Sequence, residues 1–369
     1  MLFLEPYSLI GFNFLIGAAV GNIFYRSDYC MSGMFRDIFL LRSASLLRSL
    51  FLMITAAMLF FFILRKAGII TTYPPPSYGY ISMATITGGL IFGIGMVLAG
   101  GCVVGTLYKL AKGNIANLAA FVGIIAGSLI YAEIHPFVDD LRKDTVIIKT
   151  VLISQSFPLL EPVIIAVLFT SAVMLYIKWR KNGLLSYKAY APGYLSPLKT
   201  AFILAVLNAS VYVFSGWPMG ITTAYAKIGA YIENAVAPSH TMSLSYFNEA
   251  SFSVIRNGLR MEGGAGPGTD LISFTELPFL LGIIVGSFVT ALCLREFKIY
   301  GIPPLKQLFS AIVGGVMLGL GARIAGGCNL KFVAGGLPLL SYQALAFVLS
   351  MIAGTYWGTI LLRRVVLKI

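Results

Sequence analysis

Four long apolar blocks constrain the fold of this chain more than any other feature of its sequence. Each runs for about 17 to 22 residues with little charge, the length that a helix needs to cross a hydrocarbon core roughly 30 Å thick. The blocks are Leu159–Ile177, Leu198–Phe214, Leu277–Leu294 and Ser341–Leu362. Only 11% of the residues are charged and 58% are hydrophobic, which excludes a soluble domain. The alternating stretches of a spanning β-barrel are not seen. We therefore predict an all-α integral membrane protein.

The hydropathy pattern predicts nine spanning helices and their orientation. The spans cover about residues 9–24, 46–64, 84–99, 116–133, 158–177, 198–214, 278–294, 308–324 and 341–362. Basic residues mark cytoplasmic loops, and they follow the fifth span at Lys178 and Arg180 and the last span at Arg363. This predicts an inner-membrane protein with an external N-terminus, a cytoplasmic C-terminus, and external loops at 134–157 and 215–277. Arg65 and Lys66 lie on the wrong side in this arrangement.

Two segments of the chain repeat at a constant offset of 226 residues. GGLIFGIGMVLAGGC ends at Cys102 and GGVMLGLGARIAGGC ends at Cys328, with eight of fifteen positions identical. Extending the match pairs the first four spans with the last four. It gives a single transport domain with pseudo-repeats at about 1–135 and 198–365 and a connector helix at about 158–177. One connecting span forces the halves into opposite orientations, the inverted repeat found in many transporters.

Each repeat contains a short span that is interrupted by Gly-Gly before a cysteine. Short, glycine-interrupted spans at corresponding positions point to the binding site of a transporter. Glycine lets the backbone turn and approach a substrate, and the helix that restarts offers free N–H groups to an anion. We therefore predict a re-entrant substrate site at Gly100-Gly101-Cys102 and Gly326-Gly327-Cys328.

Other glycines and cysteines near these turns have separate interpretations. Gly89-x-x-x-Gly93 and Gly315-x-x-x-Gly319 have the spacing that lets two membrane helices touch, so we assign them to packing. Cys30 follows the first span in a polar break and is predicted to be a third thiol of the site. Its counterpart in the second half has Met219-Gly220 and no cysteine, and Cys293 is assigned to core packing.

Charged residues and histidines around the turns add little to the predicted site. Lys109, Lys112 and Lys331 are expected to extend to the membrane interface. Arg323 precedes Cys328 by five residues, so a role for Arg323 in attracting an anion is left as an open hypothesis. Both histidines, His135 and His240, fall in predicted loops far from any cysteine, so no metal site and no cofactor are expected.

These motifs resemble the YeeE/YedE sulphur-transport family, whose characterised branch takes up thiosulfate. The resemblance rests on Cys30 to Asp37, Gly100–Tyr108 and Gly326–Asn329, and it covers essentially the whole chain. It implies that three cysteines pass a small sulphur anion through a central constriction, helped by helix N-termini. The implied substrate site comprises Cys30, Cys102, Cys328, Gly100, Gly101, Gly326, Gly327 and Asn329. A cytoplasmic TusA-like sulphur-carrier protein is the implied partner, beside the lipid bilayer; no nucleic acid is expected.

Two alternatives to a thiosulfate importer stay open. The first is a transporter of a selenium compound or another reduced-sulphur species. The second is a membrane sulphurtransferase or thiol redox enzyme, which needs a thiol activated by a nearby base or cation. No Cys-x-x-Cys motif occurs in the sequence, and no histidine lies in a predicted span. A purely structural subunit needs no paired thiols. We therefore expect a transporter and not an enzyme.

Overall fold

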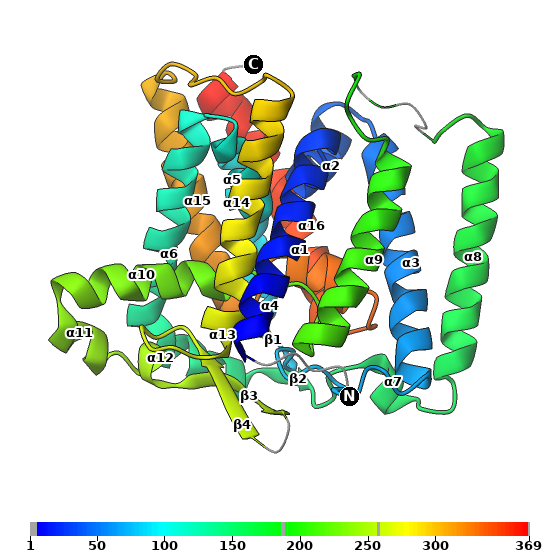
Figure 1. Cartoon of the computed structure of the whole chain (residues 1–369), viewed down its shortest axis with the longest axis horizontal. Coiled ribbons are helices and arrows are strands. Elements are labelled where there is room, and N and C mark those ends of the chain that lie inside the picture. Colours follow the sequence, from blue (N-terminus) through cyan, green and yellow to red (C-terminus); the bar gives the residue numbers. More distant parts are fainter. Residues whose placement is uncertain (1–5, 186–188, 190, 257–258, 368–369) are drawn as a thin grey trace.

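The computed structural model describes residues 6–185, 189, 191–256 and 259–367. Over this part of the chain it consists of helices and two small antiparallel sheets of two strands each. Nine helical segments among the described residues are long and apolar enough to cross a membrane. They run between the lower and the upper edge of Figure 1. The predicted all-α membrane class and the nine predicted spans are confirmed.

The first half of the chain contains four spans, two of which are followed by a short helix. Its helices are α1 (Pro6–Ser27), α2 (Met31–Leu40), α3 (Ser45–Lys66), α4 (Met83–Leu98), α5 (Val103–Ala111) and α6 (Ile115–Asp144). Strand β1 (Ile81–Ser82) pairs with β2 (Val146–Ile148), and the short α7 (Ile153–Ser156) leads to the connector α8 (Glu161–Lys181). Figure 1 shows α8 at the edge of the molecule, beside α3.

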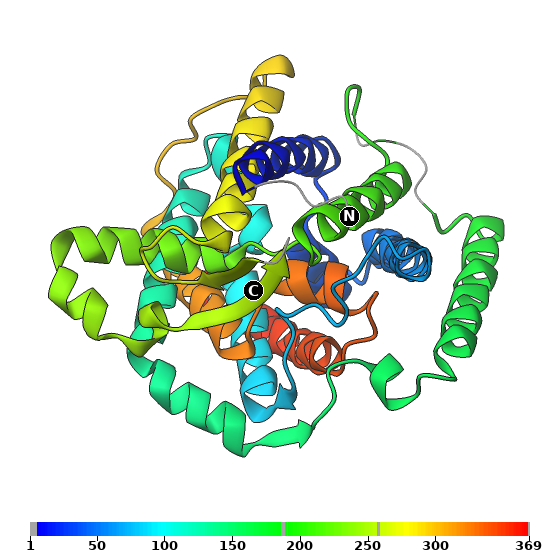
Figure 2. The same ribbon diagram turned by 60° about the horizontal axis from the view of Figure 1, so that its bottom comes forward.

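The second half repeats this order with a larger insertion. Its elements are α9 (Pro197–Ser215), α10 (Thr222–Val236), α11 (Pro238–Ser243), α12 (Ser245–Asn248), β3 (Ala250–Arg256), β4 (Leu259–Gly264), α13 (Leu271–Phe274), α14 (Glu276–Cys293), α15 (Leu305–Ala325), the π-helix η1 (Leu330–Gly336), α16 (Tyr342–Leu361) and the π-helix η2 (Leu362–Leu367). Figure 2 shows that α10 to α12 and the β3–β4 hairpin lie over the lower face.

Two predicted external loops are therefore more ordered than expected. The first was predicted to begin at residue 134, but α6 continues to Asp144 and buries the side chain of His135. The prediction that His135 lies in a loop was wrong, because its ring nitrogen contacts the Tyr131 hydroxyl one turn earlier, which favours a continued helix. The second predicted loop, 215–277, contains four short helices and a hairpin.

The main helices of each half pack against helices of the other half, and equivalent helices have equivalent partners. Helix α1 packs on α14 and α9 packs on α3; likewise α6 packs on α15 and α16 packs on α4. Helices α4 and α15 cross each other at the centre. In Figure 1, α1 and α4 rise from the lower edge, whereas their counterparts α9 and α15 descend. This arrangement supports the inverted repeat, whose symmetry and boundaries stay a prediction.

Glycines allow these helix pairs to approach closely. A methyl group added to Gly93 would overlap the backbone of α16, and one added to Gly315 or Gly319 would overlap the backbone of α6. The assignment of these glycines to packing is confirmed. In a bilayer such contacts supply much of the association energy, because the lipid tails are as apolar as the side chains.

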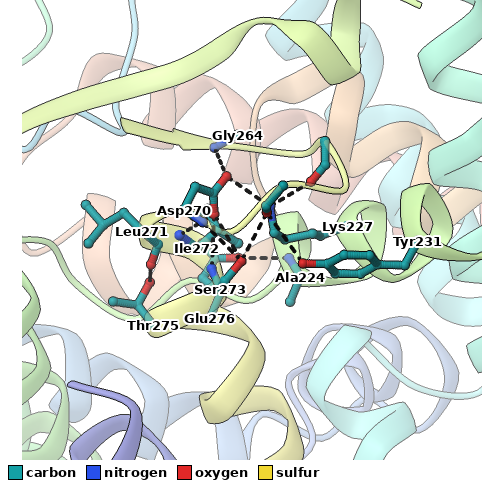
Figure 3. Close-up of polar contacts among 12 residues, drawn as sticks. Ala224, Lys227, Tyr231, Gly264, Asp270, Leu271, Ile272, Ser273, Thr275 and Glu276 are labelled. Atoms are coloured by element: carbon teal, nitrogen blue, oxygen red, sulfur yellow. Dashed lines mark hydrogen bonds and ion pairs between the residues drawn. The ribbon is translucent and has the colours of Figure 1, made fainter. Parts of the chain in front are cut away.

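A buried ion pair fastens α10 to the elements below it. Lys227, whose side chain is 0% exposed, donates to the carbonyl of Gly266 at 2.7 Å and to a carboxylate oxygen of Asp270 at 2.9 Å. Asp270 also accepts the backbone N–H groups of Gly264 and Ile272 (Figure 3). Burial lowers the pKa of Lys227, and the ion pair with Asp270 counteracts this. The fully paired network holds α10 in place.

A second ion pair explains the basic residue that contradicted the orientation rule. Arg65, at the lower end of α3, lies 2.5 Å from a carboxylate oxygen of Glu161 at the start of α8. Its guanidinium also lies over the Tyr73 ring, 4.1 Å from the ring centroid. The neighbouring carboxylate neutralises this charge, so its position at this end of the span costs little.

Candidate functional site

The structure brings Cys30 and Cys102 together near the middle of the spanning helices. Cys30 precedes α2 and Cys102 precedes α5, and both side chains are buried. A Cβ atom built on Gly105 would lie 3.2 Å from Cys30 Sγ and 3.4 Å from Cys102 Sγ. The two sulphur atoms therefore flank one point on the first turn of α5.

Both Gly-Gly turns break their helices in the same way. Helix α4 ends at Leu98 and α15 ends at Ala325, and the first glycine of each pair has a positive φ angle, 69° at Gly100 and 82° at Gly326. Only glycine adopts this conformation without steric cost. The chain then turns and starts a new helix, so that a cysteine stands before the free N–H groups of the next element. The Cys102 sulphur accepts one of them, from Gly105 at 3.3 Å.

Cys328 lies beside the same centre, on the other half of the chain. Its sulphur lies near the backbone N–H groups of Leu330 and Lys331 at the start of η1, whose N-cap residue is Asn329. The hydroxyl of Tyr225, from α10, donates to the carbonyl of Val103 at 3.0 Å and lies close to the thiols of both Cys102 and Cys328. We call Cys30, Cys102, Cys328 and Asn329 the thiol cluster.

Asn329 has an unusual environment within the thiol cluster. Its side chain is 0% exposed, and neither its amide nitrogen nor its amide oxygen makes a hydrogen bond of normal geometry to any described residue. The Cys102 thiol lies beside this amide. Leaving a buried amide unpaired costs about 1–3 kcal/mol. A polar ligand at this point would satisfy both amide atoms, so Asn329 is a candidate binding position.

Helix α10 is the fourth helix that starts near this centre. A carboxylate of the protein itself accepts the N–H groups at its start. Glu276 is buried and accepts the N–H groups of Thr223 at 2.9 Å and Ala224 at 3.2 Å. Arg323 is also buried; it donates to Thr222 and, at 3.1 Å, to the hydroxyl of Tyr246. These contacts direct Arg323 toward α10. They connect Arg323 to the start of α10, near the buried carboxylate of Glu276.

A lysine binds the first glycine of each turn. The ammonium of Lys109 lies 2.8 Å from the carbonyl oxygen of Gly100 and 3.9 Å from Cys30 Sγ. The ammonium of Lys331 lies 2.6 Å from the carbonyl oxygen of Gly326 and also contacts that of Ser77. The prediction that these lysines extend to the interface was wrong, because each turn leaves a carbonyl without a helical partner. Lys112 instead pairs with Glu296 at 3.5 Å.

A large cavity lies beside the thiol cluster, and residues from the helix ends at the upper edge of Figure 1 line it, but none of the four cluster residues does. Its volume is about 1200 Å³. Its lining includes Asp28, Arg36, Gly100, Tyr108, Lys109 and Lys306. The opposite end is closed: Tyr78 donates to the carbonyl of Lys331 at 2.8 Å, and the crevice beside Met219 measures only about 10 Å³. The cavity therefore approaches the cluster from one side, and all three thiols of the cluster are buried in this structure.

The three cysteines predicted for the site thus lie around one centre, and the fourth, which was not predicted to belong to the site, lies elsewhere. Cys293 was predicted to pack in the core, but it is exposed at the end of α14, far along the chain from any turn. Sequence reasoning missed Gly105, Tyr225, Glu276 and the contact of Lys109 with Cys30. The spacing of Gly105 from Cys102, three residues into a new helix, was the available signal for the first of these.

One group of possible metal ligands occurs among the described residues, away from the thiols. Ligand atoms of Glu133, Glu233 and His240 lie within 4.8 Å of one another at the lower face. Both ring nitrogens of His240 already face carboxylates, Glu233 at 2.6 Å and Glu133 at 3.5 Å. This geometry suits a hydrogen-bonded imidazole that links α6, α10 and α11.

Comparison with known proteins gives one matching family. The family model described as sulphur transport matches residues 26–357. Among curated relatives, thiosulfate transporter TsuA of Escherichia coli (strain K12) is 26% identical over 372 residues, covering 95% of this chain and 94% of the relative. Thiosulfate transporter TsuA of Spirochaeta thermophila is also 26% identical, covering 95% of this chain and 98% of the relative. Probable transporter YedE of Salmonella typhimurium is 27% identical over 47% of this chain and 42% of its own length.

Proposed function

The chain belongs to the sulphur transport family, and we propose that it imports thiosulfate across the inner membrane through the thiol cluster. Two relatives that align over nearly the whole chain are named thiosulfate transporters. The observation that carries the proposal is the unpaired amide of Asn329, fully buried among the thiols. Thiosulfate presents both oxygen acceptors for the amide N–H groups and a terminal sulphur for the soft thiols.

The cluster suits transport better than tight binding. A thiol is a weak hydrogen-bond donor and a weak acceptor, and it is soft and polarizable. Conduction needs sites that release a ligand as readily as they bind it. Cys30 faces the cavity side near Lys109, Cys102 adjoins it, and Cys328 lies toward the closed side near Tyr78. This order offers successive positions along one route, so we assign the chain as a transporter that leaves its substrate chemically unchanged.

We place the C-terminus and the large cavity on the cytoplasmic side. The upper edge of Figure 1 carries the ends of α1, α8 and α16, where Arg26, Lys178, Arg180 and Arg363 lie. An excess of Lys and Arg is typical of cytoplasmic loops. The closed end then faces outward, and the N-terminus is external.

Cys293 offers a direct test of this orientation. It is exposed at the upper end of α14, whereas the other three cysteines are buried. A membrane-impermeant maleimide should label Cys293 in right-side-out vesicles only after they are permeabilised, and the Cys293→Ala variant should give no label. Rapid labelling of intact vesicles would reverse the orientation.

Radiolabelled thiosulfate uptake into right-side-out vesicles tests the function. Wild-type protein should accumulate thiosulfate, and the variants Cys102→Ser, Cys328→Ala and Asn329→Ala should lose most of this activity while folding normally. Cys293→Ala serves as the matched control, since its thiol is remote from the cluster. Normal uptake by all three cluster variants would exclude the proposed site.

The same assay separates the alternatives. Stronger inhibition by selenium oxyanions or sulfide than by unlabelled thiosulfate would reassign the substrate. A persulfide found by mass spectrometry on Cys30, Cys102 or Cys328 after turnover would favour a sulphurtransferase.

We further propose that a small TusA-like sulphur-carrier protein accepts the anion at the cytoplasmic face. The cavity opens there beside the exposed Lys306. Purified carrier protein should bind inside-out vesicles, and Lys306→Glu should weaken that binding. Equal binding to vesicles without the transporter would exclude this partner.

A further inference from the structure

Lys109 lies where the large cavity meets the thiol cluster. Its ammonium is 3.9 Å from Cys30 Sγ and 2.8 Å from the carbonyl oxygen of Gly100, and its side chain lines the cavity wall. An anion that leaves Cys30 for the cavity must therefore pass this ammonium. The contact places a positive charge beside a group that offers only weak hydrogen bonds.

Two other cations of the cavity wall are paired with carboxylates. Arg36 pairs with Asp37 at 2.9 Å, and Lys112 pairs with Glu296 at 3.5 Å. Asp28, the carboxylate of the cavity wall, accepts the hydroxyl of Tyr108 at 2.7 Å. Within the described part of the chain, Lys109 has no carboxylate within ion-pair distance. Its bond to a neutral carbonyl leaves its charge available.

The corresponding lysine in the second half is not available in this way. Lys331 binds the carbonyl oxygen of Gly326, but it also contacts that of Ser77 and lies 5.2 Å from the centroid of the Tyr78 ring. The chain between α3 and β1 thus covers the second turn. Of the two lysines that bind a turn, Lys109 is the one that faces the cavity.

We propose that Lys109 is a specificity-determining residue, which receives the anion from Cys30 and favours dianions over monoanions. This inference rests on the proposed transport function. A single mobile ammonium attracts a dianion without the two-point grip of a guanidinium, which would slow release. Its attraction scales with the charge of the ligand, whereas the thiols respond mainly to softness.

Uptake by the full-length protein in proteoliposomes provides the first test. Lys109→Gln keeps a hydrogen-bond donor for the Gly100 carbonyl but removes the charge, and it should reduce thiosulfate uptake about tenfold or more at low ionic strength. Lys109→Arg should restore much of the activity with slower release, and Lys112→Gln should behave like wild type. Thiocyanate, a soft monoanion, should compete better in Lys109→Gln than in wild type.

Cys30 reactivity provides a second test that does not depend on thiosulfate transport. In a Cys293→Ala background, the rate of Cys30 modification is compared for an anionic and a neutral methanethiosulfonate reagent. Lys109→Gln should lower the ratio of anionic to neutral rates about tenfold, and Lys112→Gln should leave it unchanged. An unchanged ratio in Lys109→Gln, or equal uptake defects in the Gln and Arg variants, would overturn the proposal. If the wild-type protein does not accumulate thiosulfate but Lys109→Gln still lowers the ratio, the role of Lys109 is upheld and only the proposed substrate is refuted.

Discussion

A methyl group between the first two thiols should block the route without unfolding the protein. Gly105 lies in the first turn of α5, and a Cβ atom there would be 3.2 Å from Cys30 Sγ and 3.4 Å from Cys102 Sγ. The Gly105→Ala variant therefore keeps both thiols and fills the space between them. No charge or hydrogen-bonding group is removed, because the N–H that Cys102 accepts belongs to the backbone.

The expected effects on folding and on transport differ in size. Ordinary contacts begin at 3.4 Å, so the sulphur atoms must move by only a few tenths of an ångström. Replacing glycine by alanine in a helix gains about 0.5–1 kcal/mol, which offsets part of this strain. When an anion is bound between the two thiols, the sulphur atoms cannot move aside in this way, and the anion would be pressed against the methyl group. If it meets the usual overpacking cost of about 1–3 kcal/mol, uptake falls about 5- to 140-fold.

The assay compares Gly105→Ala with Gly33→Ala in the same vesicles. A Cβ atom on Gly33 would lie 3.8 Å from the Cys30 Cβ atom, an ordinary contact beside the same cysteine. Melting temperature and gel-filtration profile should match wild type in both variants, and only Gly105→Ala should lose uptake. Wild-type uptake by folded Gly105→Ala would show that the anion does not pass between Cys30 and Cys102.

Three further changes test other parts of the argument. Asn329→Leu removes an unpaired buried amide, so it should raise the free energy of unfolding by about 1–3 kcal/mol while abolishing uptake; a less stable variant in a thermal melt would indicate that the amide has a structural partner. Arg65→Met leaves Glu161 without its partner and should lower the free energy of unfolding by about 2 kcal/mol, whereas Lys66→Met, at an exposed position, should change it little. Equal melting temperatures of the two variants would mean that the ion pair does not stabilise the protein. Lys227→Met breaks the pair with Asp270 and should lower the free energy of unfolding by about 3 kcal/mol, whereas Lys149→Met, at an exposed position, serves as the control. The variant should also make the β3–β4 hairpin more sensitive to protease, and unchanged sensitivity would contradict the anchoring role of Lys227.

Local patterns were sufficient to predict the spans and the breaks between them. Apolar length gave the nine helices, and the repeated Gly-Gly-Cys motif located both turns, because a positive φ angle at Gly100 and Gly326 is a property of a few adjacent residues. The burial of Cys30, Cys102 and Cys328 also followed from their place beside these turns.

The residues that surround the thiols could not be predicted from local sequence patterns. Tyr225 comes from a segment that reads as a polar loop, and its hydroxyl reaches Val103, 122 positions earlier in the chain. Glu276 immediately precedes the predicted span 278–294 and was not singled out, yet it closes the start of α10. These contacts depend on how the two halves interlock, and a single sequence contains no record of that pairing.

The exchanged packing of the halves also determines when the protein can fold during its synthesis. Helix α1 enters the membrane first, but its glycines Gly17 and Gly21 fit against the backbone of α14, which begins at Glu276. The contact of α4 with α16 spans a similar sequence separation, as between Gly93 and Met351. The early helices must therefore wait in the bilayer with these small-residue faces turned to lipid until most of the chain has been translated. Assembly then proceeds by lateral association of inserted helices, and a truncated chain that ends before α14 would leave α1 without its principal neighbour.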